Sequence, residues 1–228
     1  RFVSDASHEL KTPLAGIRLL TDSILQTDHM DEETTKEFVT DIGREAERLS
    51  RITENLLRLT RLDSGVVQQP YPVAVGPVLE RVERMLTMVA QEKGVTVSGA
   101  ADEDAVALAT DDDVHQILYN LMENAIKYSA AEDGFVRAEA HVDGDKVVLT
   151  VSDNGIGIPN EDLPHIFDRF YRVDKMRSRE VGGTGLGLSI VKDTIENRGG
   201  TISAGHGANG VGTVFTVYLP LAERGEEA

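Results

Sequence analysis

Residues 181–192, VGGTGLGLSIVK, run four glycines directly into an apolar helical pattern. The free N–H groups of such a loop and the N-terminus of the following helix face one point, and both attract negative charge. The stretch fits neither the GxxxxGK[ST] loop nor a GxGxxG turn that follows a strand. It therefore predicts an anion site of another design, although a glycine-rich loop without a ligand is compatible with the same residues.

A second glycine-containing stretch, SDNGIGIP at residues 152–159, follows a predicted strand. Asp153 ends that strand, and Gly155 and Gly157 allow the backbone to approach a flat ligand closely. An ionised aspartate only accepts hydrogen bonds, which suits an exocyclic amine such as that of adenine. A tight turn capped by the aspartate explains the same residues without a ligand.

A third cluster lies in NLMENAIKYS, residues 120–129, on a predicted helix. Asn120 and Asn124 are four residues apart and share one helical face, with Lys127 close by. Amide oxygens suit a hard cation such as magnesium, and a lysine suits phosphate. Taken alone, the three residues favour an exposed polar stripe.

Between the two glycine stretches lies LPHIFDRFYRVDKMRSREV, residues 163–181. Its aromatic residues Phe167, Phe170 and Tyr171 predict a packed anchor. Its cations stand out in a chain whose net charge is −16; they are Arg169, Arg172, Lys175, Arg177 and Arg179. An anchored loop with a basic tip predicts a lid over phosphate groups, with a solvated charge run as the alternative.

The composition narrows the function classes. A net charge of −16 over 228 residues argues against a nucleic-acid partner, which needs a basic surface. The absence of cysteine excludes disulfides and thiolate metal sites. No apolar run approaches the length of a membrane span, so we expect no membrane contact in this chain and a cytoplasmic location.

The first third of the chain predicts a helical hairpin in residues 1–66. Two apolar seams step along it by three and four residues. The first consists of Val3, Ala6, Leu10, Pro13, Ile17, Leu20 and Ile24. The second consists of Phe38, Ile42, Leu49, Ile52, Leu56 and Leu59, and Glu45 is the only polar residue that interrupts it. Residues 26–31 form the predicted link, and Pro13 is expected to bend the first helix. Two hairpins pairing into a dimeric four-helix bundle are expected; a single hairpin packed on the following domain is the alternative.

The seam also places His8 and its neighbours. With Leu10 at heptad position a, His8 falls at f, the position farthest from the seam, so its side chain is predicted to be exposed. Thr12 lies four residues on, on the same face. Glu9, at g, lies at the shoulder of the helix and has the residue type to fix the tautomer of an imidazole.

Residues 67–228 mix helices and strands, which predicts a two-layer α/β sandwich and hence an α+β chain. A linker is predicted over residues 64–72, where glycine and two prolines occur. The predicted helices are 78–90, 114–128 and 186–197; the predicted strands are 95–98, 106–108, 138–142, 146–152, 201–204 and 214–219.

Together these motifs resemble the catalytic core of the sensor histidine kinases of two-component signalling. SHELKTPL (7–14) is similar to that family's phosphoacceptor box, and NLMENAIKY, DNGIGI, IFDRFYRVD and GGTGLGLSIV resemble its further boxes in the family's order. The resemblance implies a dimerisation and phosphotransfer hairpin followed by a Bergerat-type ATP-binding domain, with ATP and magnesium as cofactors. It also implies a homodimer, a response-regulator partner and a membrane or sensor segment upstream.

Carried over residue by residue, the resemblance implies that His8 is the phosphorylated histidine and that Glu9 is its hydrogen-bond partner or base. It links Thr12 to dephosphorylation of the partner. Asn124 would hold magnesium, and Asp153 would bind the adenine amine. The other implied nucleotide contacts are Asn120, Lys127, Tyr128, Gly155, Gly157, Ile158, Phe170, Arg172, Gly183, Thr184, Gly185, Leu186, Gly187 and Thr213.

Two rival functions stay open at this point. A stand-alone ATPase or nucleotide-driven clamp of the gyrase or heat-shock type uses a glutamate four residues before the metal asparagine; that position is Asn120, which cannot act as a base. A pseudokinase that binds nucleotide without chemistry is disfavoured by the presence of His8, Asn124 and Asp153.

Overall fold

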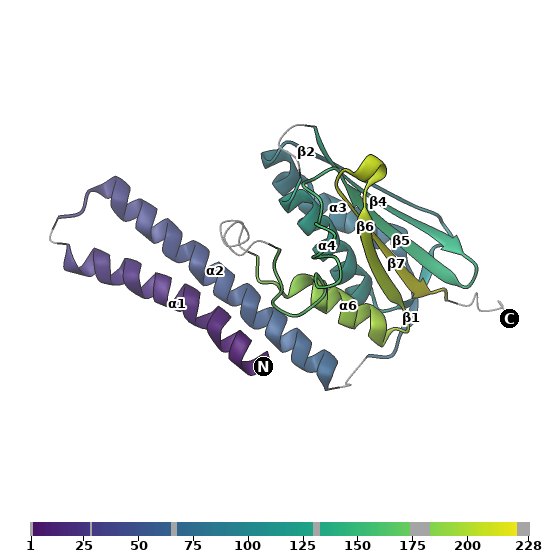
Figure 1. Ribbon diagram of the computed structural model, residues 1–228, viewed down its shortest axis with the longest axis horizontal. Coiled ribbons are helices and arrows are strands. Elements are labelled where there is room, and N and C mark those ends of the chain that lie inside the picture. Colours follow the sequence, from purple (N-terminus) through teal and green to yellow (C-terminus); the bar gives the residue numbers. More distant parts are fainter. Residues whose placement is uncertain (1, 28, 65–67, 130–132, 174–182, 223–228) are drawn as a thin grey trace.

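The computed structural model describes residues 2–27, 29–64, 68–129, 133–173 and 183–222. It shows a helical hairpin and an α/β domain that lies against the end of the hairpin where the chain begins (Figure 1). The predicted fold class, a helical hairpin followed by a two-layer α/β sandwich, is confirmed.

The hairpin consists of α1 (Phe2–Gln26) and α2 (Glu32–Asp63). The predicted seams face inward: Ala6, Pro13 and Ile52 are buried between the helices. Asp31 caps α2 by accepting the backbone N–H of Thr34 at 2.8 Å, which lowers the pKa of this carboxyl. The predicted link therefore lies where expected, and α1 continues through Pro13 rather than ending there.

The predicted linker is wrong at its C-terminal end. Residues Tyr71–Ala74 form strand β1, which pairs antiparallel with β3 (Val106–Ala109) in a separate two-stranded sheet. The pairing joins segments more than thirty residues apart, and Pro72 masked the strand pattern because proline is confined to edge positions.

The main sheet has the order β2-β4-β5-β7-β6, in which only β2 and β4 are parallel. The strands are β2 (Val95–Ala101), β4 (Gly134–Asp143), β5 (Lys146–Asp153), β6 (Thr201–His206) and β7 (Thr213–Pro220). The helices are α3 (Val75–Glu92), α4 (Asp111–Lys127) and α6 (Gly187–Asn197). All three lie on the face of the sheet that is turned toward the hairpin, and the other face is open (Figure 1).

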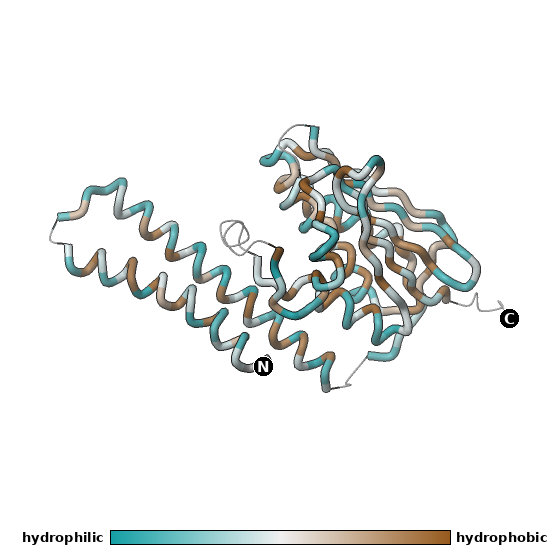
Figure 2. The backbone as a smooth tube through the Cα atoms, viewed as in Figure 1, coloured by the Kyte–Doolittle hydropathy of each residue, from teal (hydrophilic) through white to brown (hydrophobic). Residues whose placement is uncertain are grey.

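The core lies between this sheet and its helices (Figure 2). Strand β4 alternates strictly, so Val136, Ala138 and Ala140 point to the helices while their neighbours face solvent. From α4, Ile117 and Leu121 are fully buried against them. This packing fixes α4 and the ends of β5 and β7, which carry the candidate site.

A second, smaller apolar cluster joins the hairpin to the α/β domain. Leu59 of α2, Leu186 and Ile190 of α6 are fully buried together. The helices α2 and α6 cross at this point (Figure 1). In the described part of the chain, no helix is long and apolar enough to cross a membrane.

Candidate functional site

A cleft of about 990 Å³ lies between α4, the loop after β5, the loop before α6 and the facing side of α2. Most of the predicted nucleotide contacts line it: Asn120, Asn124, Lys127, Tyr128, Asp153, Gly157, Ile158, Arg172, Gly183, Thr184, Gly185, Gly187 and Thr213. Residues separated by nearly a hundred positions in the sequence therefore meet at one cavity.

Asp153 lies at one end of the cleft, where β5 ends. Its Oδ1 accepts the backbone N–H of Gly155 at 2.8 Å and that of Thr213 at 3.2 Å. Burial raises the pKa of this carboxyl, and the two N–H groups partly offset the rise. Because Oδ1 is engaged, Oδ2 is the oxygen left to accept from a ligand.

Gly155 does not line the cleft, and the backbone explains why glycine stands there. A Cβ at this position would lie 2.2 Å from the carbonyl oxygen of Tyr128. The loop after β5 can therefore pass close to the C-terminal end of α4 only without a side chain. The effect is to hold Asp153 beside α4.

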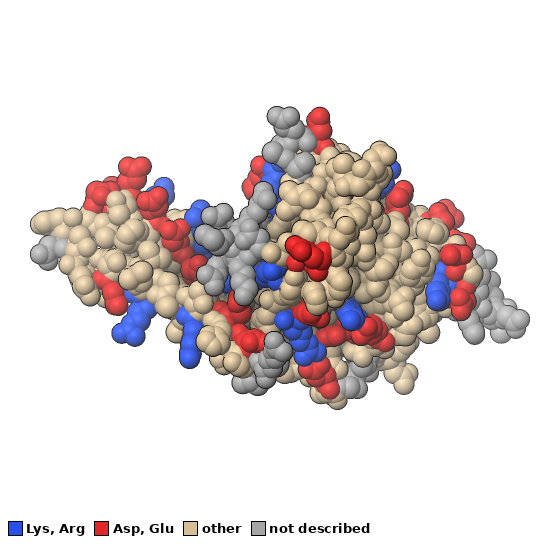
Figure 3. All heavy atoms as spheres, in the orientation of Figure 1, with Lys and Arg blue, Asp and Glu red and all other residues tan. Residues whose placement is uncertain are grey.

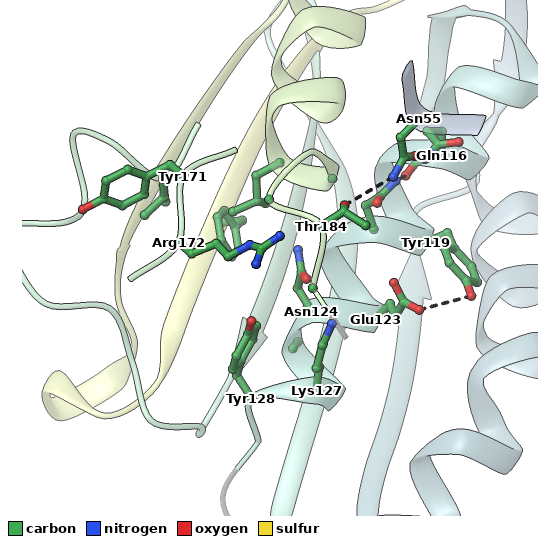
Figure 4. A pocket seen from close by; sticks show the side chains of 18 of the residues that line it. Asn55, Gln116, Tyr119, Glu123, Asn124, Lys127, Tyr128, Tyr171, Arg172 and Thr184 are labelled. Atoms are coloured by element: carbon green, nitrogen blue, oxygen red, sulfur yellow. Dashed lines mark hydrogen bonds between the residues drawn. The ribbon is translucent and has the colours of Figure 1, made fainter. Parts of the chain in front are cut away.

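The helix α4 supplies the polar wall of the cleft (Figure 4). The Asn120 amide donates to the carbonyl of Gln116 at 2.9 Å, and its Oδ1 would lie 2.8 Å from a Cβ on Gly187. Lys127 points into the cleft beside Asn124 (Figure 4). Burial is the main cause that lowers the pKa of Lys127 to about 8. The nearby cations Arg51, Lys93 and Arg172 contribute to this shift, and Glu123 opposes it.

The glycine loop meets the cleft at the N-terminus of α6. Gly185 has a φ of +70°, and a Cβ there would lie 2.9 Å from the backbone of Phe170, so only glycine fits without strain. The Phe170 N–H donates to the Gly185 carbonyl at 2.8 Å. The first turn of α6 thus lies at the cleft, which Gly187 and Leu188 line, as an anion site requires.

Phe170 and Leu186 do not line the cleft. Both pack against the cluster that contains Leu59 of α2. The structure thus places these two residues at the contact with the hairpin. Of the predicted lid cations, Lys175, Arg177 and Arg179 lie outside the described residues.

Arg172 connects the cleft to the first helix. Its side chain is only 6% exposed, and its Nη2 donates to Oε2 of Glu9 at 2.5 Å. The guanidinium also lies beside Asn124 in the cleft (Figure 4). One side chain therefore lines the candidate nucleotide site and contacts the residue next to His8.

The three predicted residues of α1, His8, Glu9 and Thr12, do not line the cleft, and Glu9 touches it only through Arg172. His8 and Thr12 are exposed, as the heptad predicts, and the Thr12 hydroxyl donates to the His8 carbonyl at 3.2 Å. Glu9 is partly buried and also accepts from Nη2 of Arg48 at 3.4 Å. The sequence did not predict these contacts of Glu9 with Arg48 and Arg172.

The sequence also did not predict that one side of α2 lines the cleft. Arg51, Glu54, Asn55, Arg58 and Arg61 line it. The Asn55 amide donates to Oγ1 of Thr184 at 3.4 Å, and Arg58 pairs with Asp112 at 3.1 Å. Their polar pattern is that of any solvent-facing helix side, so the sequence carried no signal for them.

Comparison with known proteins agrees with this geometry. Residues 1–65 match the family described as "His Kinase A (phospho-acceptor) domain", and residues 109–223 match "Histidine kinase-, DNA gyrase B-, and HSP90-like ATPase". The chain belongs to the sensor histidine kinases. Within this family, the sensor histidine kinase WalK of Bacillus subtilis is 34% identical over 229 residues, which are 99% of this chain and 37% of WalK. The sensor protein kinase WalK of Staphylococcus aureus is 33% identical over 231 residues, 96% of this chain and 53% of that protein.

This histidine kinase chain thus spans about a third to a half of the length of these relatives. Among solved structures, full-length ShkA in complex with AMPPNP has a TM-score of 0.69 at 29% identity. The match covers 95% of this chain and 44% of the ShkA chain. Histidine kinase ThkA in complex with the response regulator protein TrrA has a TM-score of 0.76 at 22% identity, covering 98% of this chain and 62% of that one. The ThkA likeness supports the fold.

Proposed function

We propose that this chain transfers the γ-phosphoryl group of ATP to His8 and then to an aspartate of a response regulator. The observation that carries the proposal is the contact of Arg172 with Glu9, because it joins the cleft to the neighbour of the exposed histidine. We further propose residues 1–66 as the dimerisation and phosphotransfer domain and residues 67–228 as the ATP-binding domain.

The residues of the cleft suit an adenine nucleotide. Asp153 offers an acceptor for the adenine amine, and Gly157 and Ile158 line the same end. Lys127, Arg172 and the N-terminus of α6 add positive charge to the lining of the cleft, which suits the phosphates. The AMPPNP held by the related ShkA is a nucleotide of this class.

Magnesium fits this site as a companion of the phosphates. Among the described residues there is no cluster of three or more histidine, cysteine, aspartate or glutamate side chains that could hold a metal ion. Magnesium commonly keeps few protein ligands and shares substrate phosphates, so the Asn124 amide oxygen is a sufficient protein ligand. When bound, the ion would neutralise charge on the phosphates.

In the proposed step one ring nitrogen of His8 attacks the γ-phosphorus, the bond to the β-phosphate oxygen breaks, and ADP leaves with that electron pair. Glu9 holds the proton on the other ring nitrogen and accepts it as the imidazole becomes cationic. Lys127 and Arg172 orient the phosphates and stabilise their charge. In the second step an aspartate oxygen of the regulator displaces the imidazole, which regenerates His8.

Several further properties belong to this proposal. Leu14, Leu25 and Val39 leave 56–82% of their surface exposed on the hairpin, which supports pairing of two chains. The regulator would then reach His8 from the exposed face of α1, where Thr12 would take part in removing phosphate from the regulator. We also propose an upstream sensor segment that anchors the full protein in the membrane.

The rival clamp function is disfavoured by Asn120. Its amide is held by the Gln116 carbonyl, at the position where a water-activating glutamate would be needed. An amide cannot take a proton from water, so this cleft lacks that base at that place.

The proposal is tested by labelling with γ-labelled ATP and magnesium. His8→Gln should abolish acid-labile, alkali-stable label while leaving nucleotide affinity unchanged; His29→Gln, an exposed histidine on the hairpin link, is the control. Asp153→Asn should weaken nucleotide binding by about 1–3 kcal/mol, because the amide would turn a donor toward the adenine amine. Acid-labile label on the His8→Gln protein would exclude His8, and unchanged affinity of Asp153→Asn would exclude its role.

A further inference from the structure

A chain of charged side chains runs from the interior of the hairpin to the cleft. Nη1 of Arg48 lies 3.6 Å from Oε2 of Glu45, and Nη2 of Arg48 lies 3.4 Å from Oε2 of Glu9. The same Oε2 of Glu9 accepts from Arg172 at 2.5 Å. Glu45 is the one polar residue in the seam of α2, so the network explains a break in the apolar pattern.

The burial of the charged Arg48 side chain costs free energy of folding. Its side chain is 8% exposed, and its Nε is buried with no hydrogen-bond partner in the described part of the chain, as is Oε2 of Glu45. A buried ion pair of this kind is often replaced by apolar residues without loss of stability. The cost therefore points to a role for Arg48 other than holding the hairpin together.

The two arginines that contact Glu9 differ in whether a bound nucleotide could draw them away from its carboxylate. Arg172 belongs to the ATP-binding domain and lines the cleft, where phosphate groups would compete with Glu9 for its guanidinium. Arg48 belongs to α2, which packs against α1, and it is not among the residues that line the cleft. When Arg172 turns to the phosphates, Arg48 is the cation that stays on the Glu9 carboxylate.

We propose that Arg48 is a positioning residue for phosphoryl transfer: it holds the Glu9 carboxylate beside His8 when Arg172 is engaged by the nucleotide. The inference rests on the proposed roles of Glu9 and His8. Arg48 touches neither ATP nor His8 and acts only through Glu9. Its loss should therefore slow the transfer step and leave nucleotide binding unchanged.

The experiment compares Arg48→Met, Arg48→Lys and Arg44→Met in the dimeric protein. Arg44 is the matched control, since it lies one helical turn away and pairs with Asp41 in an exposed position. Initial labelling rates at saturating γ-labelled ATP should fall about 10-fold or more for Arg48→Met, which is part of the roughly 10²- to 10⁴-fold that a positioned acid or base contributes. Nucleotide affinity should not change, Arg48→Lys should restore most of the rate, and Arg44→Met should match the unaltered protein.

A double-mutant cycle separates this role from a structural one. In a Glu9→Gln background, Arg48→Met should cost less than about twofold, because Arg48 would have nothing left to position. If Arg48→Met lowers the labelling rate of the Glu9→Gln protein as much as it lowers that of the unaltered protein, the proposal is wrong. A labelling rate of Arg48→Met equal to that of the unaltered protein would also overturn it. Light scattering and thermal melting show whether Arg48→Met is a folded dimer. If it is not, Arg48→Lys is compared in the unaltered and in the Glu9→Gln protein. It should lower the labelling rate, by less than Arg48→Met would, only when Glu9 is present.

Failure of the underlying function gives a different result. If the unaltered protein and Arg44→Met carry no acid-labile label on His8, the proposed reaction fails and the proposal for Arg48 fails with it. If they are labelled and the cycle is additive, only the role of Arg48 is wrong.

Discussion

Lys127 is a residue whose charge depends on pH in the working range. Burial and the nearby cations hold its pKa at about 8, below the usual lysine value. It is therefore mostly charged near neutral pH and mostly neutral one unit above its pKa. Only the charged form attracts phosphate, so nucleotide affinity should fall as the pH rises through about 8.

The prediction is measured by titrating ADP between neutral and alkaline pH. Because about nine tenths of Lys127 is neutral one unit above its pKa, affinity should fall by up to about 10-fold over that rise. Lys127→Met should bind more weakly at neutral pH and lose most of the pH dependence, whereas Lys146→Met, at the far end of β5, should keep it. An identical pH dependence in Lys127→Met would show that another group is responsible.

At the residue scale, the sequence was informative where a local rule applied. The heptad predicted that His8 is exposed and that Thr12 shares its face, because helical periodicity alone determines both. It did not predict that Glu9 contacts Arg48 and Arg172, which lie 39 and 163 residues away. Such contacts depend on how two helices and two domains meet.

At the element scale, the contact of α2 with α6 decides how the two domains meet. The helix α2 covers Glu32–Asp63, and its C-terminal part lies against α6. Leu59 lies on that part, and its buried neighbours are Leu186 and Ile190 of the ATP-binding domain. The seam thus predicted correctly that Leu59 is buried, but it did not identify Leu186 and Ile190 as its neighbours.

This contact can be tested with an engineered disulfide. The side chains of Asn55 and Thr184 are adjacent, with Nδ2 and Oγ1 at 3.4 Å, and the chain has no cysteine of its own. Oxidation of Asn55→Cys with Thr184→Cys should form a cross-link within one chain. Adding Leu59→Glu should slow it at least about 10-fold, because a charge would be buried in the cluster.

The matched control is Leu57→Glu, two residues earlier on α2, where the side chain lines the cleft but leaves 56% of its surface exposed, so a charge there stays in contact with water. It should leave the rate of cross-linking unchanged. If Leu59→Glu and Leu57→Glu behave alike, the apolar cluster does not hold the domains together in solution.

The same scale shows what else the sequence could supply. Long periodic helices and the β4–β5 hairpin, with its turn at Gly144, were predicted because each signal is local. Strand β1 was not, since four residues that include Pro72 become a strand only by pairing with β3. The cleft-facing side of α2 was missed for a similar reason, as polar residues there look the same whether they face water or another domain.

At the scale of the whole molecule, the ATP-binding domain lies on the hairpin of its own chain. Within the described ranges, polar contacts besides Asn55–Thr184 also connect the two parts, among them Glu9–Arg172, Arg58–Asp112 and Asp63–Arg169. The last is also supported by Asp193, and it lowers the pKa of Asp63 through the Arg169 guanidinium. The cleft therefore contacts α1 of the same chain through Arg172 and Glu9, the neighbour of His8, which the sequence motifs alone do not determine.

This arrangement predicts that ATP bound by one chain phosphorylates His8 of that same chain. The test is a mixed dimer in which one chain carries His8→Gln and the other Asp153→Asn, purified through two different tags. The first chain binds ATP but has no acceptor, and the second has the acceptor but binds ATP weakly. Transfer within a chain should leave the mixed dimer with no more label than Asp153→Asn alone.

A dimer of unaltered and His8→Gln chains is the control, and it should retain about half of the normal label because one acceptor remains intact. Strong label on the Asp153→Asn chain of the mixed dimer would contradict the prediction, because the phosphoryl group would then have come from ATP on its partner. In that case the contact of Arg172 with Glu9 within one chain would describe a resting arrangement. The domain would have to leave it, breaking the Leu59 cluster and the polar contacts named above, before transfer to the partner's histidine.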